Sequence, residues 1–509
     1  MGRFFEMALM IVSMAVLGRM LTPEDFGIFG IILAVQALLL PFLDFGLKTA
    51  FIKLEEADNE IANLFFTMNL GFGILISSIL IVTAPLLAYT YDHSILLPLM
   101  LSFAPTILIR SLAMQPIAHL NRQKRFGGTT LARMAGVLSG SVAAIMGAWI
   151  GLGVWSFIIR AFVHDGMMCA IVHRLSKVRY NIVSLHSLRK GIENLRFGGE
   201  IVASRLLAGA LGSVDRLLFG RFYSTQLLGF YTKAVDVATL PDKNIRTALS
   251  TPALAHLSRL PDRRLRDGYI LLHTGVLFVA GLPCVICIIA GDRLLPLLMG
   301  SQWVDAGIYL QILGILGLGR LLFGLVTIMH INEKSMPRLW RIYGSAIVFT
   351  LALPLLVAWL GAEAMTYTYT LSTASLAFWV VVSSQSLRLF TGSWKAPWQV
   401  GWFTFVMILP ASIAGLVLRL AISPYLGNTQ TASAVLVAIV TIGCLTAAVA
   451  AQWILNRSYA FELCIFLRDG LFRRSKGSQN ACSSDIASQI GNSPSCATSG
   501  TSRVSGAQA

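Results

Sequence analysis

With 509 residues, of which 56% are hydrophobic and 13% charged, the chain is too poor in charge to be soluble, since a soluble domain is normally about 25% charged. Its net charge of +16 does not indicate a nucleic-acid partner, because the basic residues stand in short connectors between apolar runs. Together with a mean hydropathy of +0.72, these features predict an integral membrane protein.

Apolar runs long enough to cross a bilayer follow one another along the chain. A membrane-spanning helix needs about 20 mostly apolar residues, and we identify fourteen candidates, which predict an all-α polytopic fold. The eighth is the weakest, because Lys233, Asp236, Asp242 and Lys243 surround Pro241 and should line a wet interior. The predicted spans are 4–21, 26–47, 62–89, 95–118, 128–150, 153–174, 197–220, 226–248, 269–290, 303–329, 340–360, 362–387, 399–420 and 432–455.

The lysines and arginines of the connectors predict the orientation. One alternating set of connectors carries 21 of them, whereas the other set, with its flanks, carries four. The positive-inside rule therefore predicts that both termini are cytoplasmic and that the connector at Thr22–Asp25 faces outward. From Ser475 onward the chain contains ten serines and few apolar residues, which indicates a disordered cytoplasmic tail.

A hairpin motif occurs twice. Stretches 17–30 and 219–231 each contain a Gly-Arg pair, with a second glycine nine residues after the first. A second motif is also repeated: His-Leu-Asn at 119–121 follows the fourth predicted span, and His-Ile-Asn at 330–332 follows the tenth. Because six spans separate each pair, we expect two parallel six-helix repeats. The predicted division is 1–195 for the first lobe, 196–395 for the second, 396–456 for two extra helices, and 457–509 for the tail, disordered from about 475.

Eight basic residues fall within predicted spans and cannot all face lipid, because each would cost about 2.5 kcal/mol or more. They outnumber the acids beside them, so we expect a cationic cavity that suits an anionic group such as phosphate. Helix periodicity places Arg205, Gly209, Gly212 and Arg216 on one face of the seventh span. The predicted substrate-binding residues are Arg110, Arg133, Arg160, Arg205, Arg216, Lys233 and Arg320, and the predicted cavity acids are Asp44, Glu200, Asp215 and Asp236.

Structural pairing is the alternative role for these charges. Asp215 with Arg216, and Lys233 with Asp236, could neutralise each other, and Arg160, His164 and Asp165 could form a local network. No phosphate-binding loop, serine-hydrolase motif or metal-spaced histidine cluster occurs, so neither an enzyme nor a metal site is predicted. The pair Cys284 and Cys287 stands in an apolar run without histidine or acidic neighbours, which favours packing.

Five stretches in order resemble the polysaccharide transporter family, the lipid-linked oligosaccharide flippases of the MOP exporter superfamily. They are LGRMLTPEDFGIFG, DFGLKTAFIK, GLGVWSF, SVDRLLFGRFYSTQLLGFYTKA and LLMGSQWVDAG, and the resemblance runs from about Gly18 to the twelfth span. The resemblance implies a fourteen-helix, two-lobe transporter of the bacterial inner membrane. It would carry undecaprenyl-diphosphate-linked repeat units outward by alternating access, for exopolysaccharide or lipopolysaccharide biosynthesis, with cavity cations holding the diphosphate. Lys233 departs from the arginine expected at its position.

The resemblance implies no cofactor and leaves the coupling ion open between H⁺ and Na⁺. A polymerase and a chain-length regulator of the same pathway are candidate partners. Two alternatives stand beside the flippase. A multidrug or small-molecule exporter of the same fold would need an acidic cavity for cationic drugs, and a membrane polysaccharide polymerase or ligase usually carries a long external loop.

Overall fold

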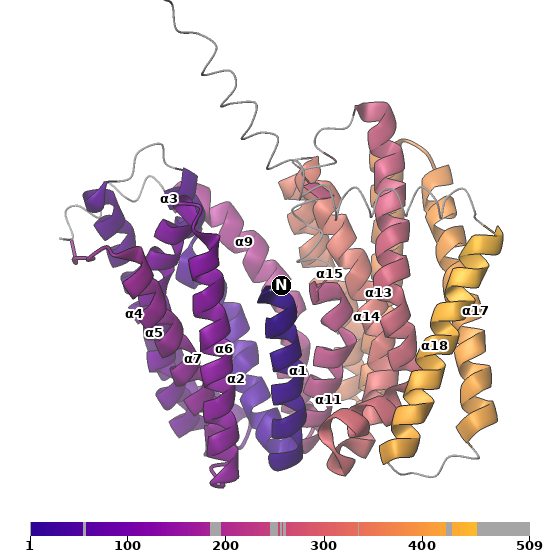
Figure 1. The fold of residues 1–509 in the computed structure, drawn as a ribbon, viewed down its shortest axis with the longest axis horizontal. Coiled ribbons are helices and arrows are strands. Elements are labelled where there is room, and N and C mark those ends of the chain that lie inside the picture. The colour runs from indigo at the N-terminus through magenta and orange to yellow at the C-terminus, as the bar shows by residue number, and fades with distance from the viewer. Residues whose placement is uncertain are drawn as a thin grey trace, which may run out of the picture. The chain divides into compact units, whose positions relative to one another are not determined.

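The structure is a computed structural model that describes residues 2–53, 58–183, 195–244, 253–254, 257, 261–333, 335–423 and 430–455. Every regular element within these ranges is a helix, which confirms the all-α prediction. The long helices lie roughly parallel or antiparallel to one another (Figure 1). Residues Met1–Ala451 form one compact unit, and the predicted tail from residue 457 lies outside the described residues.

The helices follow the predicted spans closely. Up to Ser176 the chain contains α1 (Gly2–Met20), α2 (Pro23–Asp44), α3 (Leu47–Lys53), α4 (Asn59–Thr90), α5 (Leu96–Arg122), α6 (Phe126–Trp149) and α7 (Trp155–Ser176). From Leu195 onward it contains α9 (Leu195–Leu211), α10 (Val214–Phe222), α11 (Thr225–Ala238), α13 (Asp262–Met299), α14 (Val304–Asn332), α15 (Met336–Trp359), α16 (Ala364–Thr391), α17 (Lys395–Ile422) and α18 (Gln430–Leu455).

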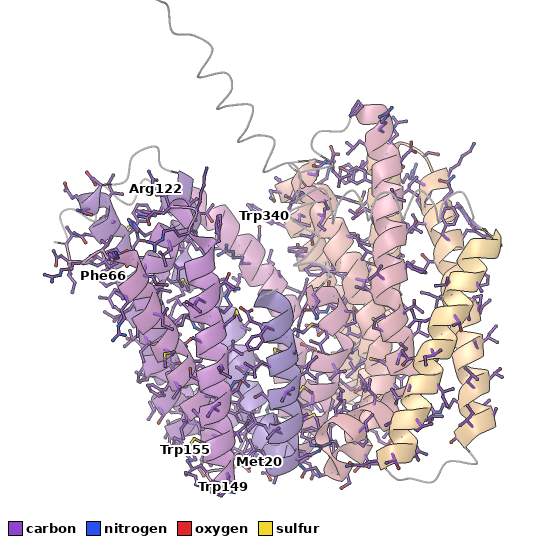
Figure 2. All side chains as sticks on the ribbon, viewed as in Figure 1. Met20, Phe66, Arg122, Trp149, Trp155 and Trp340 are labelled. Carbon is purple, nitrogen blue, oxygen red and sulfur yellow. The ribbon has the colours of Figure 1, made fainter. Side chains whose placement is uncertain are left out.

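Ten helical segments of the described ranges are long and apolar enough to cross a membrane. The protein is therefore a multi-pass membrane protein, whereas the predicted number of fourteen spans stays a prediction. Connectors alternate between two ends of the helices, as the charge pattern requires. Met20 and Trp149 lie at one end, here called the Met20 end, and Arg122 and Trp340 lie at the other, the Arg122 end (Figure 2).

Two predicted spans differ from the structure. The seventh is broken between Leu211 and Val214, because Gly212 and Ser213 have low helix propensity. The single face predicted for Arg205 and Arg216 assumed an unbroken helix and is therefore wrong. The eighth was predicted as 226–248, but α11 ends at Ala238. Pro241 lacks the amide hydrogen that would bond the carbonyl of Val237, so the helix cannot continue unchanged.

The repeated hairpin motif begins α2 and α11 in the same way. Thr22 accepts a hydrogen bond from the Asp25 amide and Asp25 bonds back, which forms a capping box before Pro23. The matching residue of the second motif, Ser224, accepts from the Leu227 amide. Each motif therefore starts a helix with a hydroxyl cap.

The two motifs pack against each other about a local pseudo-two-fold axis. A Cβ atom on Gly27 would stand 1.9 Å from the Thr225 carbonyl oxygen, and one on Gly229 would stand 1.8 Å from the Pro23 carbonyl oxygen. Gly27 matches Gly229 in the repeat, and Pro23 matches Thr225, so the contact is made twice with exchanged partners. Only glycine allows α2 and α11 to approach this closely.

A second exchanged contact closes the same end. Tyr91, which follows α4, donates to the Leu217 carbonyl of α10 at 2.9 Å. Trp303, which precedes α14, donates to the Gly18 carbonyl of α1 at 2.7 Å. In each half an aromatic residue between the third and fourth spans thus holds the end of the first helix of the other half. Burial raises the pKa of Tyr91 to about 12, so its hydroxyl remains a donor at neutral pH.

We expect Tyr91→Phe to lower the free energy of unfolding by about 1 kcal/mol, because it removes one hydrogen bond. Trp303→Phe should cost more, because it also leaves a cavity where the buried indole packed on Phe26 and Phe230. Thermal unfolding of the purified protein would measure this. The loss for Tyr91→Phe should be equal at pH 6 and pH 9, since both lie below the unfolded and folded pKa of the phenol. Tyr89→Phe and Trp149→Phe are matched controls, because these side chains are 87% and 80% exposed.

Candidate functional site

One carboxylate gathers three cations where α10 meets α11. Asp236 receives Arg216 Nη2 at 3.0 Å, Lys233 Nζ at 3.2 Å and Lys243 Nζ at 3.6 Å. These four side chains together carry more positive than negative charge. Arg216 and Lys233 are 12% and 14% exposed, whereas Lys243 is 47% exposed and lies at the accessible side of the group. We call these four residues the Asp236 cluster.

Aromatic side chains hold Asp215 beside the Asp236 cluster and contact Lys233 within it. The Tyr231 hydroxyl donates to the Asp215 carboxylate at 2.7 Å, and the Tyr367 hydroxyl donates to the Asp215 carbonyl at 3.2 Å. Lys233 Nζ lies 4.9 Å from the ring centre of Phe26 on α2. Arg216 thus pairs with Asp236, and Asp215 bonds Tyr231, which replaces the pairing considered for Asp215 and Arg216. The pairing of Lys233 with Asp236 is as predicted.

Arg320 serves the break between α9 and α10. Its guanidinium donates to the carbonyl of Leu211, the last residue of α9. The final carbonyls of a helix have no partner within the helix, so a donor from α14 stabilises this end. Arg320 therefore has a structural contact in addition to its predicted role in binding.

We expect Arg320→Met to lower the free energy of unfolding by about 1–3 kcal/mol, because Leu211 is buried and its carbonyl would lose this donor. Arg320→Lys, which keeps a charged donor, should recover part of the loss. Thermal unfolding of both variants is the measurement. A methionine variant that unfolds like the parent would contradict the structural role.

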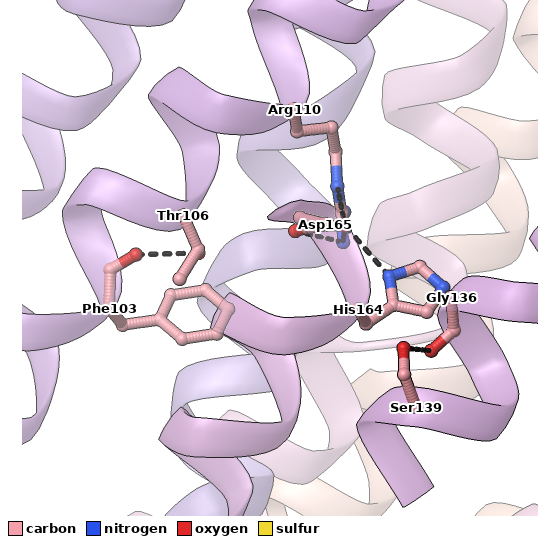
Figure 3. Close-up of polar contacts among 7 residues, drawn as sticks. All are labelled: Phe103, Thr106, Arg110, Gly136, Ser139, His164 and Asp165. Atoms are coloured by element: carbon pink, nitrogen blue, oxygen red, sulfur yellow. Dashed lines mark hydrogen bonds and ion pairs between the residues drawn. The ribbon is translucent and has the colours of Figure 1, made fainter. Parts of the chain in front are cut away.

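A second charged group connects α5 with α7. Arg110 makes a two-pronged contact with the Asp165 carboxylate, with Nη2 at 3.2 and 3.1 Å from its oxygens (Figure 3). His164 Nδ1 lies 2.8 Å from the same carboxylate. Asp165 is 3% exposed, whereas Arg110 and His164 are 27% and 26% exposed. The local network predicted around Asp165 thus takes its arginine from α5.

Glycines of α6 bring α7 close behind this group. A Cβ on Gly136 would stand 2.9 Å from the His164 carbonyl oxygen, and one on Gly140 would stand 3.0 Å from the Arg160 carbonyl oxygen. Close packing is therefore the role of these glycines. Arg160 itself is partly buried.

The other predicted site residues are exposed or cannot be placed. Arg133 and Arg205 are exposed on α6 and α9. The side chains of Asp44 and Glu200 fall outside the part of the chain that the structure describes. Of the predicted set, Arg216, Lys233 and Asp236 meet directly, and Asp215, next to Arg216 in the chain, bonds Tyr231 instead.

A comparison of the whole chain with known families adds to this geometry. A family model described as polysaccharide biosynthesis protein matches residues 16–307, which is more than half of the chain. The chain belongs to the polysaccharide biosynthesis protein family. The match covers both copies of the hairpin motif, together with the residues of the Asp236 cluster and the Arg110–Asp165 pair.

Several curated relatives also align with the chain. The teichuronic acid biosynthesis protein TuaB of Bacillus subtilis is 25% identical and the lipopolysaccharide biosynthesis protein WzxC of Escherichia coli is 22% identical, each over 61% of this chain. The succinoglycan biosynthesis transport protein ExoT of Rhizobium meliloti is 25% identical over 69% of this chain. The alignments span 65%, 63% and 70% of the respective relatives.

The fold also has a solved counterpart. The structure of the lipid II flippase MurJ in an inward closed conformation matches with a TM-score of 0.68, over 90% of this chain and 98% of that chain. The two sequences are 14% identical, so the likeness concerns the fold.

Two residues outside the predicted set complete the charged groups of this family member. Asp165 binds Arg110, and Lys243 joins Asp236. The signal for Lys243 was its position seven residues after Asp236, which would put both on one helix face, although α11 ends between them. Asp165 and Arg110 stand 55 residues apart, so no local spacing could have paired them. Among the described residues no group of three or more metal-type ligands gathers.

Proposed function

We propose that this chain is a flippase that moves an undecaprenyl-diphosphate-linked oligosaccharide across the bacterial inner membrane. It would act in exopolysaccharide or lipopolysaccharide biosynthesis, with both termini cytoplasmic. The Asp236 cluster is the observation that carries the proposal. Its three cations, which contact one carboxylate here, could instead bind a diphosphate, which has more negative charge and more acceptor oxygens than a carboxylate. Family membership and the fold shared with MurJ support it.

The proposed mechanism is alternating access without a chemical step. The exchanged contacts of Gly27, Gly229, Tyr91 and Trp303 would keep the Met20 end closed while substrate enters from the Arg122 end. Opening the Met20 end requires α2 and α11 to separate. A bound diphosphate would draw Arg216, Lys233 and Lys243 away from Asp236, and this change would couple substrate binding to opening of the Met20 end. H⁺ or Na⁺ could supply the driving force.

The proposal is tested in a strain that lacks the gene, by measuring polymer export and by mass spectrometry of extracted undecaprenyl-linked intermediates. We expect polymer to be lost and a complete lipid-linked repeat unit to accumulate, inaccessible to glycosidase added outside the inner membrane. The mass of this intermediate would identify the substrate. A repeat unit that accumulates on the outer side would instead indicate a polymerase, and unchanged intermediates would indicate a small-molecule exporter.

A further inference from the structure

A groove of about 820 Å³ lies between α15 and α16, outside the charged groups described above. The two helices run in opposite directions, so residues near the start of α15 face residues near the end of α16. Polar and apolar side chains separate along the groove. Its lining includes Arg338, Arg341, Ser345, Phe349, Phe378 and Gln385.

The end of the groove nearest Trp340, at the Arg122 end, is cationic. Arg338 and Arg341 are both exposed, and they stand three residues apart on one face of α15. Within the described ranges neither forms an ion pair with a carboxylate, and Arg341 Nε makes only a long 3.4 Å contact with the Pro337 carbonyl. Two neighbouring guanidiniums without a carboxylate partner are suited to binding a phosphate group.

The rest of the groove is apolar and open. Phe349 stacks on Phe378 with ring centres 6.0 Å apart, and Phe349 and Val381 remain 66% and 53% exposed. Ala374 and Ala377 leave space on the α16 side. Phe349 lies eight residues after Arg341, about 12 Å along the helix. The groove thus matches an amphiphile with an anionic head and a hydrocarbon chain.

The groove opens away from α9, and its inner wall includes His330 of α14. Trp340 of α15 donates to Ser204 of α9 at 2.7 Å, and α9 in turn packs on α2. At 100° per residue, Arg338, Arg341 and Phe349 lie roughly 100–180° around α15 from Trp340. A molecule in the groove therefore contacts surrounding lipid, which favours a resident membrane lipid over transported cargo.

We propose that the α15–α16 groove binds an anionic phospholipid, with its phosphate between Arg338 and Arg341 and an acyl chain beside Phe349 and Phe378. The positive-inside bias puts this end of α15 in the cytoplasmic leaflet, where anionic headgroups attract basic side chains. The site does not depend on the proposed transport function. Bound lipid would brace α15 against α16.

The test is native mass spectrometry of the full-length protein with phosphatidylglycerol, phosphatidylcholine or undecaprenyl diphosphate added. We expect Arg338→Ala/Arg341→Ala to weaken phosphatidylglycerol binding at least about tenfold and to leave phosphatidylcholine binding unchanged. The control Arg264→Ala/Arg266→Ala removes the same charge from exposed positions of α13 and should bind phosphatidylglycerol like the parent. Ala377→Trp, which fills the groove, should also weaken binding.

Inorganic phosphate separates a headgroup site from a free-anion site. We expect it to compete weakly, because the acyl chain contributes much of the affinity. Equal losses in the test and control variants, or unchanged binding in both Arg338→Ala/Arg341→Ala and Ala377→Trp, would overturn the proposal. A clear preference for undecaprenyl diphosphate would also overturn it and would make the groove a docking site for the carrier lipid.

Discussion

Gly229→Ala is expected to abolish polymer export in cells, because the new methyl group collides with the backbone of α2. Its Cβ would stand 1.8 Å from the Pro23 carbonyl oxygen, and helices must separate until this distance reaches at least 3.0 Å. We expect a cost of about 1–3 kcal/mol in the free energy of unfolding, the usual range for overpacking. Export in a complemented deletion strain and thermal unfolding of the purified protein are the measurements.

The pseudo-symmetry of this contact makes the prediction sharper. Gly27→Ala should have the same effect, because its Cβ meets the Thr225 carbonyl oxygen at 1.9 Å. The double variant should cost clearly less than the two single costs together, since one separation of α2 from α11 relieves both collisions. Gly71→Ala and Gly344→Ala are matched controls in α4 and α15, where a Cβ meets no atom within 4 Å. Variants of Gly27 and Gly229 that behave like these controls would contradict the role of the contact.

Asp236→Asn is expected to lower the amount of folded protein and to abolish export. It removes the carboxylate that pairs with the largely buried Arg216 and Lys233, and an unpaired buried charge is costly. We expect a loss of about 2–3 kcal/mol, near the lower limit for buried pairs, because Asp236 keeps 23% of its surface exposed. Protein level in membranes and thermal unfolding would show it.

A second substitution separates stability from transport. Arg216→Gln combined with Asp236→Asn removes one charge of each sign and should recover part of the lost stability. Export should stay absent, because a guanidinium proposed to bind the diphosphate is gone. If the double variant regains both stability and export, the Asp236 cluster is structural, and the proposal that it binds substrate fails.

Local patterns in the chain were enough to predict most of the helices. Apolar runs predicted α4, α5 and α6 to within a few residues, because the bilayer imposes a length and a composition on each helix separately. Propensity and capping act over a few residues, so the N-cap Thr22 before α2 was readable from the chain, although we predicted that span only from residue 26. The break at Gly212 was readable from its residues, but we assumed a continuous helix.

Charge partners could not be predicted in the same way. Spacing along one helix suggested the contact of Lys233 with Asp236, three residues apart. It could not suggest Arg110 with Asp165, or Arg320 with the Leu211 carbonyl, because these partners stand on different helices. The choice among several acids for one arginine depends on how helices rotate about their axes, and a one-residue slip turns a side chain by about 100°.

The repeated Gly-to-Gly spacing was visible in the sequence, but its role depends on contacts between distant helices. The sequence alone established that the hairpin of residues 17–30 recurs at 219–231, since a repeat is a property of the chain itself. Its reason appears only in the folded protein, where Gly27 packs against the backbone of Thr225 in α11 and Gly229 packs against the backbone of Pro23 in α2. Contacts between segments 200 residues apart depend on packing of every helix between them, and no local propensity specifies that packing.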